Sequence, residues 1–462
     1  MDPMLSEDLN TVDALLAATL DAARKAIGGL DTRPVAARVP EPAVVPVPAA
    51  GIGGAAALAR FEQRWAPWFS GSAGPRYFGF VTGGATPAAV AGDWLTSAYD
   101  QNVVSGDSAA PDLERETVGW LAELFGLGTG HHGAFVTGAT MSNLVGLAVA
   151  REWLGEQAGV SPADAGVAAL GPVPVLSGTP HSTVHKALSI LGMGRDRLRL
   201  VPTLPGREAV DVDRLADALA TLDGRPAVVV ANAGTVNTVD FDDLRAIAAL
   251  KQRFPFWLHV DGAFGAFAAL SPRYRHLVDG LAEADSVCVD LHKWLNVPYD
   301  SAVQFTRRRD LQVAVFRNDG AYLPPPVGEP EFVHLTPETS RRLRALPAWF
   351  SLVAYGRAGH REIVERTTAL AGRLGAWVAD QPGLRLLAPV RLNVVCATVA
   401  GDPTRERVAA LVRAVAHGGE AVVTPTVYDG TPAFRVAFSN WRTTESDVDR
   451  LCAVLAAHVT GS

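Results

Sequence analysis

The sequence predicts an α/β protein whose large domain is built on a mostly parallel central sheet and is followed by a smaller C-terminal α+β domain. Between about residues 130 and 310, short apolar runs alternate with helical patterns, as in a parallel sheet covered by helices. The runs are rich in valine, which suits strands buried on both faces. Beyond residue 345 this alternation stops. The 462 residues, 48% of them hydrophobic, are enough for two or three packed units.

Residues 1–75 are predicted to form an N-terminal arm. An amphipathic helical pattern comes first, with apolar positions at Val12, Leu15, Leu16 and Leu20. The stretch VPEPAVVPVPAAG follows, and its prolines exclude a regular helix. Because an isolated helix of this length is marginal in water, we expect the arm to pack on a neighbouring chain.

Residues 76–345 are predicted to form the large domain. Six of its segments are strand-like: PVPVLSG, RLRLVPT, PAVVVANAG, FWLHVDG, DSVCVDLHK and SAVQFTR. Helical patterns lie between several of them, near residues 142–155, 183–193, 211–222 and 241–253.

Residues 346–462 are predicted to form the small domain. A long helical pattern is followed by two apolar segments, LNVVCATV and PAFRVAFSN. Helices are expected between them at 403–417 and at the end near 444–458.

The composition argues against several classes of protein. The formal net charge of −7 is spread along the chain without a Lys/Arg-rich run, so we expect no nucleic-acid partner. No apolar run reaches the length of a membrane span, and the first residues, MDPMLSEDLNTVDALL, lack the regions of a secretory signal. We therefore expect a cytoplasmic protein that does not bind membranes.

A metal site and a disulfide framework are not expected either. Cys288, Cys396 and Cys452 lie far apart without CxxC spacing. The spacings of the three histidines treated as structural, His131, His132 and His185, match no metal pattern.

Lys293 is the strongest candidate for chemistry that needs a primary amine, because arginine cannot form an imine. The chain has only four lysines. Lys293 follows an apolar strand and is flanked by His292 and Trp294, whereas Lys25, Lys186 and Lys251 lie on helices and are expected at the surface. A buried lysine is rare unless it is paired or reactive, and desolvation is expected to lower its pKa.

Asp261 in LHVDGAF ends a buried strand, where α/β sheets place ligand-binding groups. It could equally be a helix N-cap or a turn residue. The segment FVTGATMSNL passes from a strand into a helix through small residues, as in phosphate-binding turns, although Thr140 could be only an N-cap. His181 follows another strand and could stack on a planar ring, although a lone histidine is more often structural.

Together these segments resemble the group II pyridoxal-phosphate-dependent amino-acid decarboxylases, which include the aromatic-amino-acid and glutamate decarboxylases. The resemblance covers nearly the whole chain through the ordered segments PRYFGF, DLERETVGWL, VTGATMSNL, SGTPHSTVHKA, NAGTVNTVDFDDL, WLHVDGAFGAF, DSVCVDLHKWLNVPYD, SRRLRALPAWF and FRVAFSNWRTT. It implies the aspartate-aminotransferase-like fold, PLP fold type I, and pyridoxal 5′-phosphate as the cofactor.

The resemblance also implies roles for individual residues. Lys293 would form the Schiff base, with His292 beside it, and Asp261 would pair with the pyridinium nitrogen. Ala263 would contact one face of the ring and His181 would stack on the other. The cofactor phosphate would be bound by Gly138, Ala139, Thr140 and Ser286, and the substrate would lie near Phe80, Val81 and Thr82.

The chain departs from the family pattern at one position that bears on the reaction. Members commonly carry a tyrosine on a loop after the lysine, thought to protonate the carbanionic intermediate, but PPPVGEPEFVHLTPETSRRLRALP has none, and Phe332 falls near its expected place. Tyr322 matches a different, structural tyrosine. Met141 and Val236 replace an acidic residue and a threonine that are frequent in the family, and neither change removes the case for the cofactor.

Three functions follow as hypotheses. The first is decarboxylation of an L-amino acid to an amine and CO2, with His292 or water protonating Cα; the pocket lacks an obvious arginine pair for a second carboxylate, which favours aromatic or aliphatic substrates over glutamate. The second is another Cα reaction, namely decarboxylation with deamination to an aldehyde, transamination or C–C bond formation. The third is a binding protein without catalysis, which the presence of Lys293, Asp261 and His181 argues against.

By resemblance the protein is expected to be a C2 homodimer.

Overall fold

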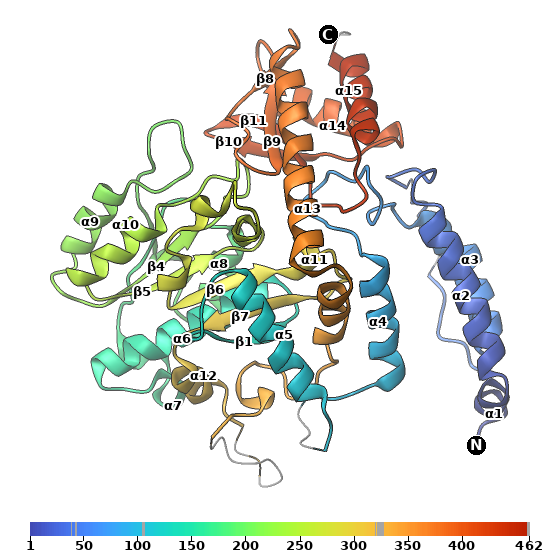
Figure 1. Cartoon of the computed structure of the whole chain (residues 1–462), viewed down its shortest axis with the longest axis horizontal. Helices are drawn as coiled ribbons and strands as arrows, with labels where there is room; N and C mark the ends of the chain where they lie inside the picture. Colours follow the sequence, from blue (N-terminus) through green and yellow to red (C-terminus); the bar gives the residue numbers. More distant parts are fainter. Residues whose placement is uncertain (38, 42–43, 104–106, 319, 321–327, 460–462) are drawn as a thin grey trace.

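The computed structural model describes residues 1–462 except 38, 42–43, 104–106, 319, 321–327 and 460–462. Its largest unit is built on a seven-stranded sheet in the order β1-β7-β6-β5-β4-β2-β3 (Figure 1). β7 is antiparallel to both of its neighbours and the remaining pairs are parallel. The predicted α/β class with a mostly parallel sheet is confirmed. The strands are β1 (His132–Val136), β2 (Val175–Ser177), β3 (Leu198–Leu200), β4 (Ala227–Asn232), β5 (Phe256–Asp261), β6 (Ser286–Asp290) and β7 (Ala302–Thr306).

Helices cover this sheet on both faces. β4, β5, β6 and β7 are buried at every position, as expected for strands packed on both sides. α6 contacts β6 and β7 and packs beside α8 and α12. The helices of this unit are α4 (Pro87–Tyr99), α5 (Ala110–Leu124), α6 (Ala139–Ala158), α7 (Pro162–Ala165), α8 (Ser182–Ile190), α9 (Val212–Ala220), α10 (Leu244–Ala249), α11 (Leu291–Trp294) and α12 (Arg309–Phe316).

The parallel strands end at a common edge of the sheet. The register pairs Asn232 of β4 with Asp261 of β5, and Asp261 with Cys288 of β6. Two residues after Cys288, Asp290 ends β6 and the chain turns into the short helix α11, which carries Lys293. Polar residues from neighbouring strands are thereby brought together.

The C-terminal unit packs a four-stranded antiparallel sheet, in the order β10-β11-β9-β8, against helices. Its strands are β8 (Leu384–Leu386), β9 (Val394–Val399), β10 (Thr424–Tyr428) and β11 (Thr431–Ala437), and its helices are α13 (Ala345–Ala379), α14 (Arg405–His417) and α15 (Glu445–Val459). α13 is kinked at Gly356, where φ is 57°, a conformation that glycine adopts without a steric penalty. It extends from α4 and α5 to the small sheet. The domain limits at 75/76 and 345/346 stay predictions.

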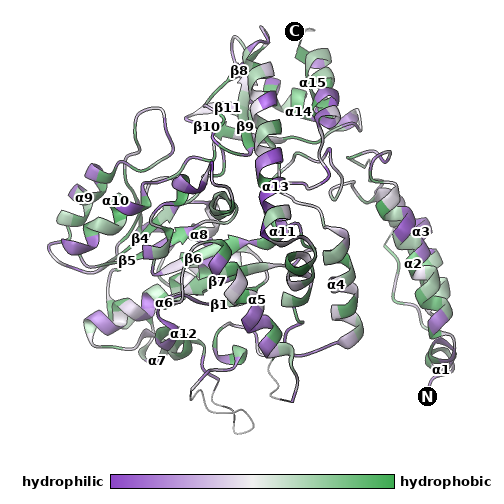
Figure 2. Ribbon diagram, viewed as in Figure 1, coloured by the Kyte–Doolittle hydropathy of each residue, from purple (hydrophilic) through white to green (hydrophobic). Residues whose placement is uncertain are grey.

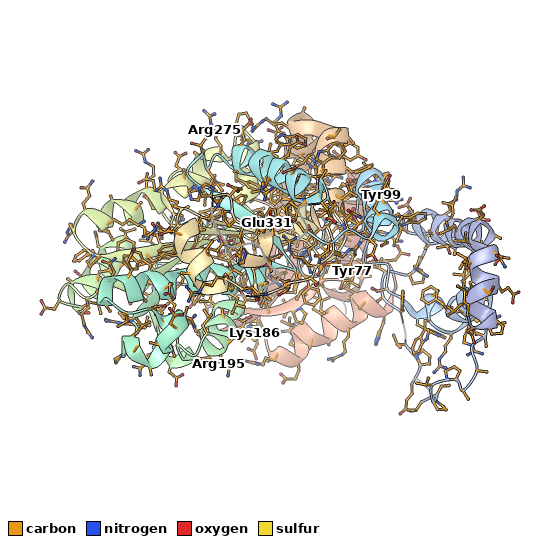
Figure 3. All side chains as sticks on the ribbon, turned by 90° about the horizontal axis from the view of Figure 1, so that it is seen from below. Tyr77, Tyr99, Lys186, Arg195, Arg275 and Glu331 are labelled. Atoms are coloured by element: carbon orange, nitrogen blue, oxygen red, sulfur yellow. The ribbon has the colours of Figure 1, made fainter. Side chains whose placement is uncertain are left out.

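The N-terminal helices α1 (Pro3–Asn10), α2 (Val12–Gly28) and α3 (Gly54–Arg64) lie beside the body of the protein (Figure 1). None of their residues is buried, and Figure 2 shows apolar residues along them. In the turned view of Figure 3 they again stand apart from the central unit, whose surface carries charged residues such as Lys186 and Arg195. Among the described residues, none of the helices combines the length and apolar character that crossing a bilayer requires.

Candidate active site

A pocket of about 280 Å³ opens where the strands of the large sheet end. Nine of the residues predicted for the site line it: Phe80, Val81, Thr82, Ala139, His181, Asp261, Ala263, His292 and Lys293. Val236, which stands where the family often has a threonine, also lines the pocket. The other lining residues were not predicted from the sequence: Thr179, Asn232, Gly234, Thr235, Phe264, Tyr299 and Arg435. The structure therefore brings together segments that are more than 300 residues apart in the chain.

Lys293 projects from α11 into this pocket and is paired with a carboxylate. Its Nζ lies 3.0 Å from Oδ2 of Asp290 and 5.5 Å from the centre of the Phe264 ring. Burial alone lowers the pKa of Lys293, but the negative charges of Asp290 and Asp261 outweigh that effect, so the pKa is raised. This corrects the expectation of a lowered pKa, which considered desolvation without a neighbouring anion. The other lysines differ: Lys25 and Lys186 are exposed, and Lys251 is paired with Asp285.

Asp261 is held by a buried hydrogen-bond network centred on Asn143 of α6. The Nδ2 group of Asn143 donates to Oδ2 of Asp261 at 2.9 Å and to Oγ1 of Thr183 at 3.1 Å. Its Oδ1 lies 2.9 Å from Nε2 of His259, so His259 must donate from Nε2 to satisfy an amide oxygen. Oδ1 of Asp261 accepts from the backbone N–H of Ala263 at 3.1 Å. Both carboxylate oxygens are therefore fixed in position.

Ser286 belongs to the far end of this network and does not line the pocket. It is the first residue of β6, whereas Asp290, which contacts Lys293, is the last, about 13 Å away at the usual rise of a strand. Its hydroxyl lies 2.8 Å from Nδ1 of His259 and accepts from Nε1 of Trp257 at 2.9 Å. This geometry does not support the predicted phosphate contact. Burial lowers the pKa of His259 to about 4, against the opposing effect of Asp261, so its imidazole is neutral at pH 7.

His181 is tied to the same network through Thr183. It caps the N-terminus of α8, and its Nδ1 lies 2.9 Å from Oγ1 of Thr183 and accepts the backbone N–H of that residue. Burial lowers the pKa of His181, although Asp261 acts in the opposite direction. A neutral imidazole with one nitrogen engaged in this way is oriented to present its ring to the pocket.

The predicted phosphate-binding turn meets α11 at the start of α6. Gly138 precedes the helix, and a Cβ placed there would lie 3.8 Å from both Oδ1 of Asp290 and Cε1 of His292. The first N–H of the helix, from Ala139, donates to Oδ1 of Asp290 at 2.8 Å. Thr140 does not line the pocket. Of the three residues predicted for this turn, Gly138, Ala139 and Thr140, only Ala139 lines the pocket.

The segment after PRYFGF runs along α11. The N–H of Gly83 donates to the backbone oxygen of His292 at 3.2 Å, and a Cβ at Gly83 would fall 1.8 Å from the backbone oxygen of Lys293. Only glycine permits this approach. The Oγ1 of Thr82 is buried without a hydrogen-bond partner, and it faces a pocket in which a ligand could supply one.

Arg435 comes to the pocket from β11 of the small unit. Its guanidinium donates to the backbone oxygen of Val236, and its Nε is buried without a partner. The segment FRVAFSN predicts no role for this arginine, which is 142 residues from Lys293 in the chain. Only the docking of the two units brings both residues to the same pocket.

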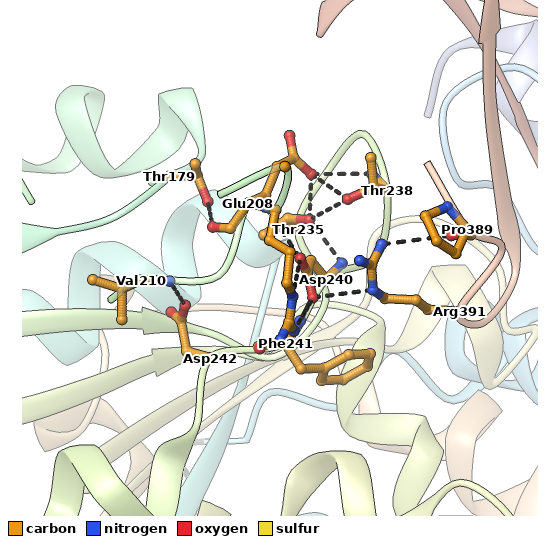
Figure 4. A network of polar contacts seen from close by, with 12 residues as sticks. Thr179, Glu208, Val210, Thr235, Thr238, Asp240, Phe241, Asp242, Pro389 and Arg391 are labelled. Atoms are coloured by element: carbon orange, nitrogen blue, oxygen red, sulfur yellow. Dashed lines mark hydrogen bonds and ion pairs between the residues drawn. The ribbon is translucent and has the colours of Figure 1, made fainter. Parts of the chain in front are cut away.

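A polar network fixes the seam between the two units (Figure 4). Asp240 accepts hydrogen bonds from Arg207 and forms an ion pair with Arg391 of the small unit at 3.2 Å. Glu208 accepts from Thr235, which lines the pocket, at 2.5 Å and from Thr238 at 2.7 Å. Thr235 therefore belongs both to the wall of the pocket and to the seam between the units.

Tyr299 lies beside the lysine although no tyrosine was predicted for the site. Its ring centre is 4.3 Å from that of His292. Tyr299 is 61% exposed, and its partial desolvation, with smaller effects from Asp290 and Tyr77, raises its pKa to about 12. The phenol therefore stays protonated at neutral pH. Burial lowers the pKa of His292, with Asp290 acting in the opposite direction.

Phe332, the residue near the expected position of the missing loop tyrosine, is buried in a short 3-10 turn and packs against the guanidinium groups of Arg115 and Arg341. It does not line the pocket of its own chain. Tyr322 lies outside the described residues. Met141 packs against a small apolar cluster that contains Val136 and Val145.

These residues fit pyridoxal phosphate. The pocket offers a primary amine, a fixed carboxylate for a pyridinium nitrogen, and two buried polar atoms without partners, Oγ1 of Thr82 and Nε of Arg435. Among the described residues, no group of His, Cys, Asp and Glu is arranged to hold a metal ion.

Residues 58–399 match the family model described as the pyridoxal-dependent decarboxylase conserved domain. The chain is 28% identical over 389 residues to an aromatic-L-amino-acid decarboxylase of Bacillus atrophaeus, an alignment that covers 81% of this chain and 79% of that protein. It is also 25% identical over 425 residues to a phenylacetaldehyde synthase of Petunia hybrida, with 84% and 81% covered.

Solved structures share the fold. The crystal structure of Oryza sativa TDC with PLP and tryptamine superposes with a TM-score of 0.91 at 24% identity and covers 100% of this chain and 99% of that one. The structure of mouse CSAD gives a TM-score of 0.89 at 21% identity, with 99% of both chains covered. The predicted fold type I is confirmed.

Proposed function

Because the chain belongs to the pyridoxal-dependent decarboxylase family and so uses pyridoxal phosphate, we propose that it decarboxylates an L-amino acid to the amine and CO2. One observation supports this most directly. The amine of Lys293, the carboxylate of Asp261 and the guanidinium of Arg435 face one pocket, and these groups are suited to bind the cofactor aldehyde, its ring nitrogen and a substrate carboxylate.

The bound cofactor supplies an electron sink for the pair released when a bond at Cα breaks. Residues of the protein support this electron sink by binding and orienting the cofactor. Asp261, held by Asn143 and by the N–H of Ala263, would pair with the ring nitrogen and favour its protonated form. His181, oriented by Thr183, presents a ring for stacking.

Arg435 is proposed to bind the substrate carboxylate. A guanidinium matches a carboxylate in shape and charge, and the unpaired Nε provides a donor without breaking an existing bond. Among the described lining residues Arg435 is the one arginine. A single guanidinium favours substrates with one carboxylate, which supports an aromatic or aliphatic side chain over glutamate.

Tyr299 is proposed to give the proton that Cα needs once CO2 has left. Its hydroxyl remains protonated at neutral pH, and its ring packs on His292 beside Lys293. His292, the candidate from sequence, is then the neighbour that positions the phenol. The proton forms the new C–H bond, and the phenolate is reprotonated from solvent.

Product analysis tests this proposal. Purified protein treated with borohydride would carry the cofactor on Lys293, as peptide mass spectrometry can show. Incubation with a panel of L-amino acids should then release CO2 and the matching amine in equal amounts. No CO2 from any amino acid would overturn the decarboxylase proposal while leaving cofactor binding intact.

Formation of an aldehyde is the second candidate. The absence of the family's loop tyrosine from the sequence and the similarity to the phenylacetaldehyde synthase favour it. Aldehyde, ammonia and hydrogen peroxide would appear in place of the amine, with oxygen consumed. Transamination would instead give a keto acid and no CO2.

We further propose that the protein is a cytoplasmic C2 homodimer whose N-terminal arms pack on the partner. α1 to α3 expose large apolar side chains, among them Leu5, Leu9, Leu16, Leu20 and Phe61, at 40% or more of their surface, which a second copy would cover. A monomer in light scattering would contradict the dimer, and secretion of the protein would contradict the location.

A further inference from the structure

Glu208 is a buried acidic residue that no step of the proposed reaction uses. It lies in the connection between β3 and α9, is 8% exposed, and does not line the active-site pocket. Taking a carboxylate out of water is unfavourable unless hydrogen-bond donors surround it. The donors around Glu208 therefore indicate what its burial achieves.

These donors come from one loop after β4. Oε2 of Glu208 accepts from Oγ1 of Thr235 at 2.5 Å, and from Oγ1 and the backbone N–H of Thr238 at 2.7 and 3.1 Å. Oε1 accepts from Nδ2 of Asn237 at 3.1 Å. Figure 4 shows the carboxylate between Thr235 and Thr238. Four hydrogen bonds thus fix the loop on both sides of Val236.

Val236 is the residue that orients Arg435. Its backbone oxygen accepts a hydrogen bond from Nη1 of Arg435, and both residues line the pocket. Within the part of the chain that the structure describes, this is the only hydrogen bond of the guanidinium, and no carboxylate forms an ion pair with it. The direction of the guanidinium therefore depends on where the loop holds this oxygen.

The same loop is also bonded to the hairpin that carries Arg435. Oδ1 of Asn237 accepts from Oγ1 of Thr426 at 2.7 Å, and its Nδ2 donates to the backbone oxygen of Val427 at 3.3 Å. Thr426 and Val427 belong to β10, which pairs with β11. Asn237 is thus shared between Glu208 and the strands of the small unit.

Glu208 acts on Arg435 through its charge as well. Burial lowers the pKa of Arg435, whereas Cys396 and Glu208 act in the opposite direction. Burial raises the pKa of Cys396 to about 12, so its thiol is uncharged at neutral pH. Glu208 is then the anion that favours the charged guanidinium, and it does so without occupying the donors of Arg435.

We propose that Glu208 is a positioning residue, which fixes the loop around Val236 so that Arg435 presents its guanidinium to the substrate carboxylate. Glu208 itself touches neither substrate nor cofactor. The inference rests on the proposed role of Arg435 and extends it to a residue outside the pocket. It holds whether the product is an amine or an aldehyde.

Two pairs of compounds test the inference on the cofactor-loaded protein: L-phenylalanine with 2-phenylethylamine, and L-leucine with 3-methylbutylamine. Each amine equals its amino acid without the carboxylate. Rapid-mixing absorbance of the bound cofactor gives the Kd of each compound before turnover. Glu208→Gln is the principal variant, because it keeps the size of the side chain and removes its charge.

Glu208→Gln should raise the Kd of the amino acid about two- to tenfold, the usual range for one lost hydrogen bond, and leave the Kd of the amine unchanged. In a protein that already carries Arg435→Met, the same substitution should have no further effect, because the residue through which Glu208 acts is gone. Thr238→Val, which removes one donor to Glu208, should act in the same direction and more weakly.

Tyr428→Phe is the matched control. It removes a hydrogen bond across the same seam, from the phenol to the backbone oxygen of Gly206 at 3.3 Å, and leaves the contacts of Glu208 intact. Both Kd values should stay at those of the wild type. A change in Tyr428→Phe as large as that in Glu208→Gln would overturn the inference, by showing that any weakening of the seam has the same result.

Equal losses of amino-acid and amine affinity in Glu208→Gln would overturn the inference, because they would indicate a general disturbance of the pocket. So would a loss of amino-acid affinity that persists in full with Arg435→Met. If Glu208→Gln does not fold, Thr238→Val decides, and wild-type affinity for the amino acid would then count against the inference. If Arg435→Met alone bound both amino acids as tightly as the wild type, or if the wild type bound neither, the proposed role of Arg435 would fail first.

Discussion

Oδ2 of Asp290 lies 3.0 Å from Nζ of Lys293, so the lysine proposed to hold the cofactor also forms an ion pair with a buried carboxylate. Charge and chemical reactivity at this position can therefore be separated by substitution. Arginine keeps the positive charge but cannot form an imine, whereas alanine removes both.

We predict that Lys293→Arg and Lys293→Ala both lose the visible absorbance band of bound cofactor and the borohydride adduct. Lys293→Arg should stay closer to the wild type in its free energy of unfolding, because Asp290 keeps a cationic partner. Absorbance spectra and denaturant titrations measure the two effects. An adduct that survives on another lysine, such as exposed Lys186, would contradict the assignment.

The raised pKa of Lys293 predicts how stability depends on pH. A group whose folded pKa lies above its unfolded value stabilises the folded state fully below the unfolded value, 10.5 for lysine, and loses that contribution as the pH rises through the folded pKa. The difference in unfolding free energy between cofactor-free wild type and Lys293→Met should therefore shrink above that pH. A difference that stays constant from neutral to alkaline pH would contradict the ion pair.

Asn143→Ala should weaken cofactor binding and lower the free energy of unfolding by about 1–3 kcal/mol, because Asp261 and His259 each lose a buried hydrogen-bond partner. Thr183→Val is the comparison variant, since it removes the contacts of Thr183 to Asn143 and His181 but leaves Asn143 bonded to Asp261, and it should weaken cofactor binding less than Asn143→Ala. Denaturant titrations and cofactor titrations compare the two variants. Equal cofactor affinity in Asn143→Ala and the wild type would argue against the positioning role.

Arg435→Met should weaken binding of the amino acid by about tenfold or more, the usual cost of a lost charge-assisted hydrogen bond. The amine product has no carboxylate, so its affinity should change little. Competition experiments with substrate and product distinguish the two. A parallel loss for both ligands would indicate a general disturbance of the pocket.

Tyr299→Phe should slow amine formation and increase the share of aldehyde, because the phenol no longer supplies a proton to Cα. The measurement is the amine-to-aldehyde ratio under air and under nitrogen. Tyr77→Phe, which changes a phenol that does not line the pocket, is the control. An unchanged amine-to-aldehyde ratio in Tyr299→Phe would indicate that His292 or water, and not Tyr299, protonates Cα.

The sequence was most informative where chemistry follows a strand directly. Lys293, Asp261 and His181 each come just after a strand-like run, and parallel strands end at one edge, so their meeting could be predicted. Ser286 was misplaced because it begins its strand and therefore lies at the opposite edge. Asn143, Tyr299 and Arg435 were missed for a different reason: helix rotation, a turn and the docking of the small unit place them, and none of these has a local sequence signal.

The seam that joins Arg391 to Asp240 has a consequence for the placement of the substrate carboxylate. Arg435 belongs to the small unit and Lys293 to the large one, so the way the two units pack sets the distance between the group proposed for the carboxylate and the lysine proposed for the cofactor. Substitutions at Arg391 or Asp240 would change that distance without altering a residue that lines the pocket. A change in the rate of the reaction can thus begin at residues outside the pocket.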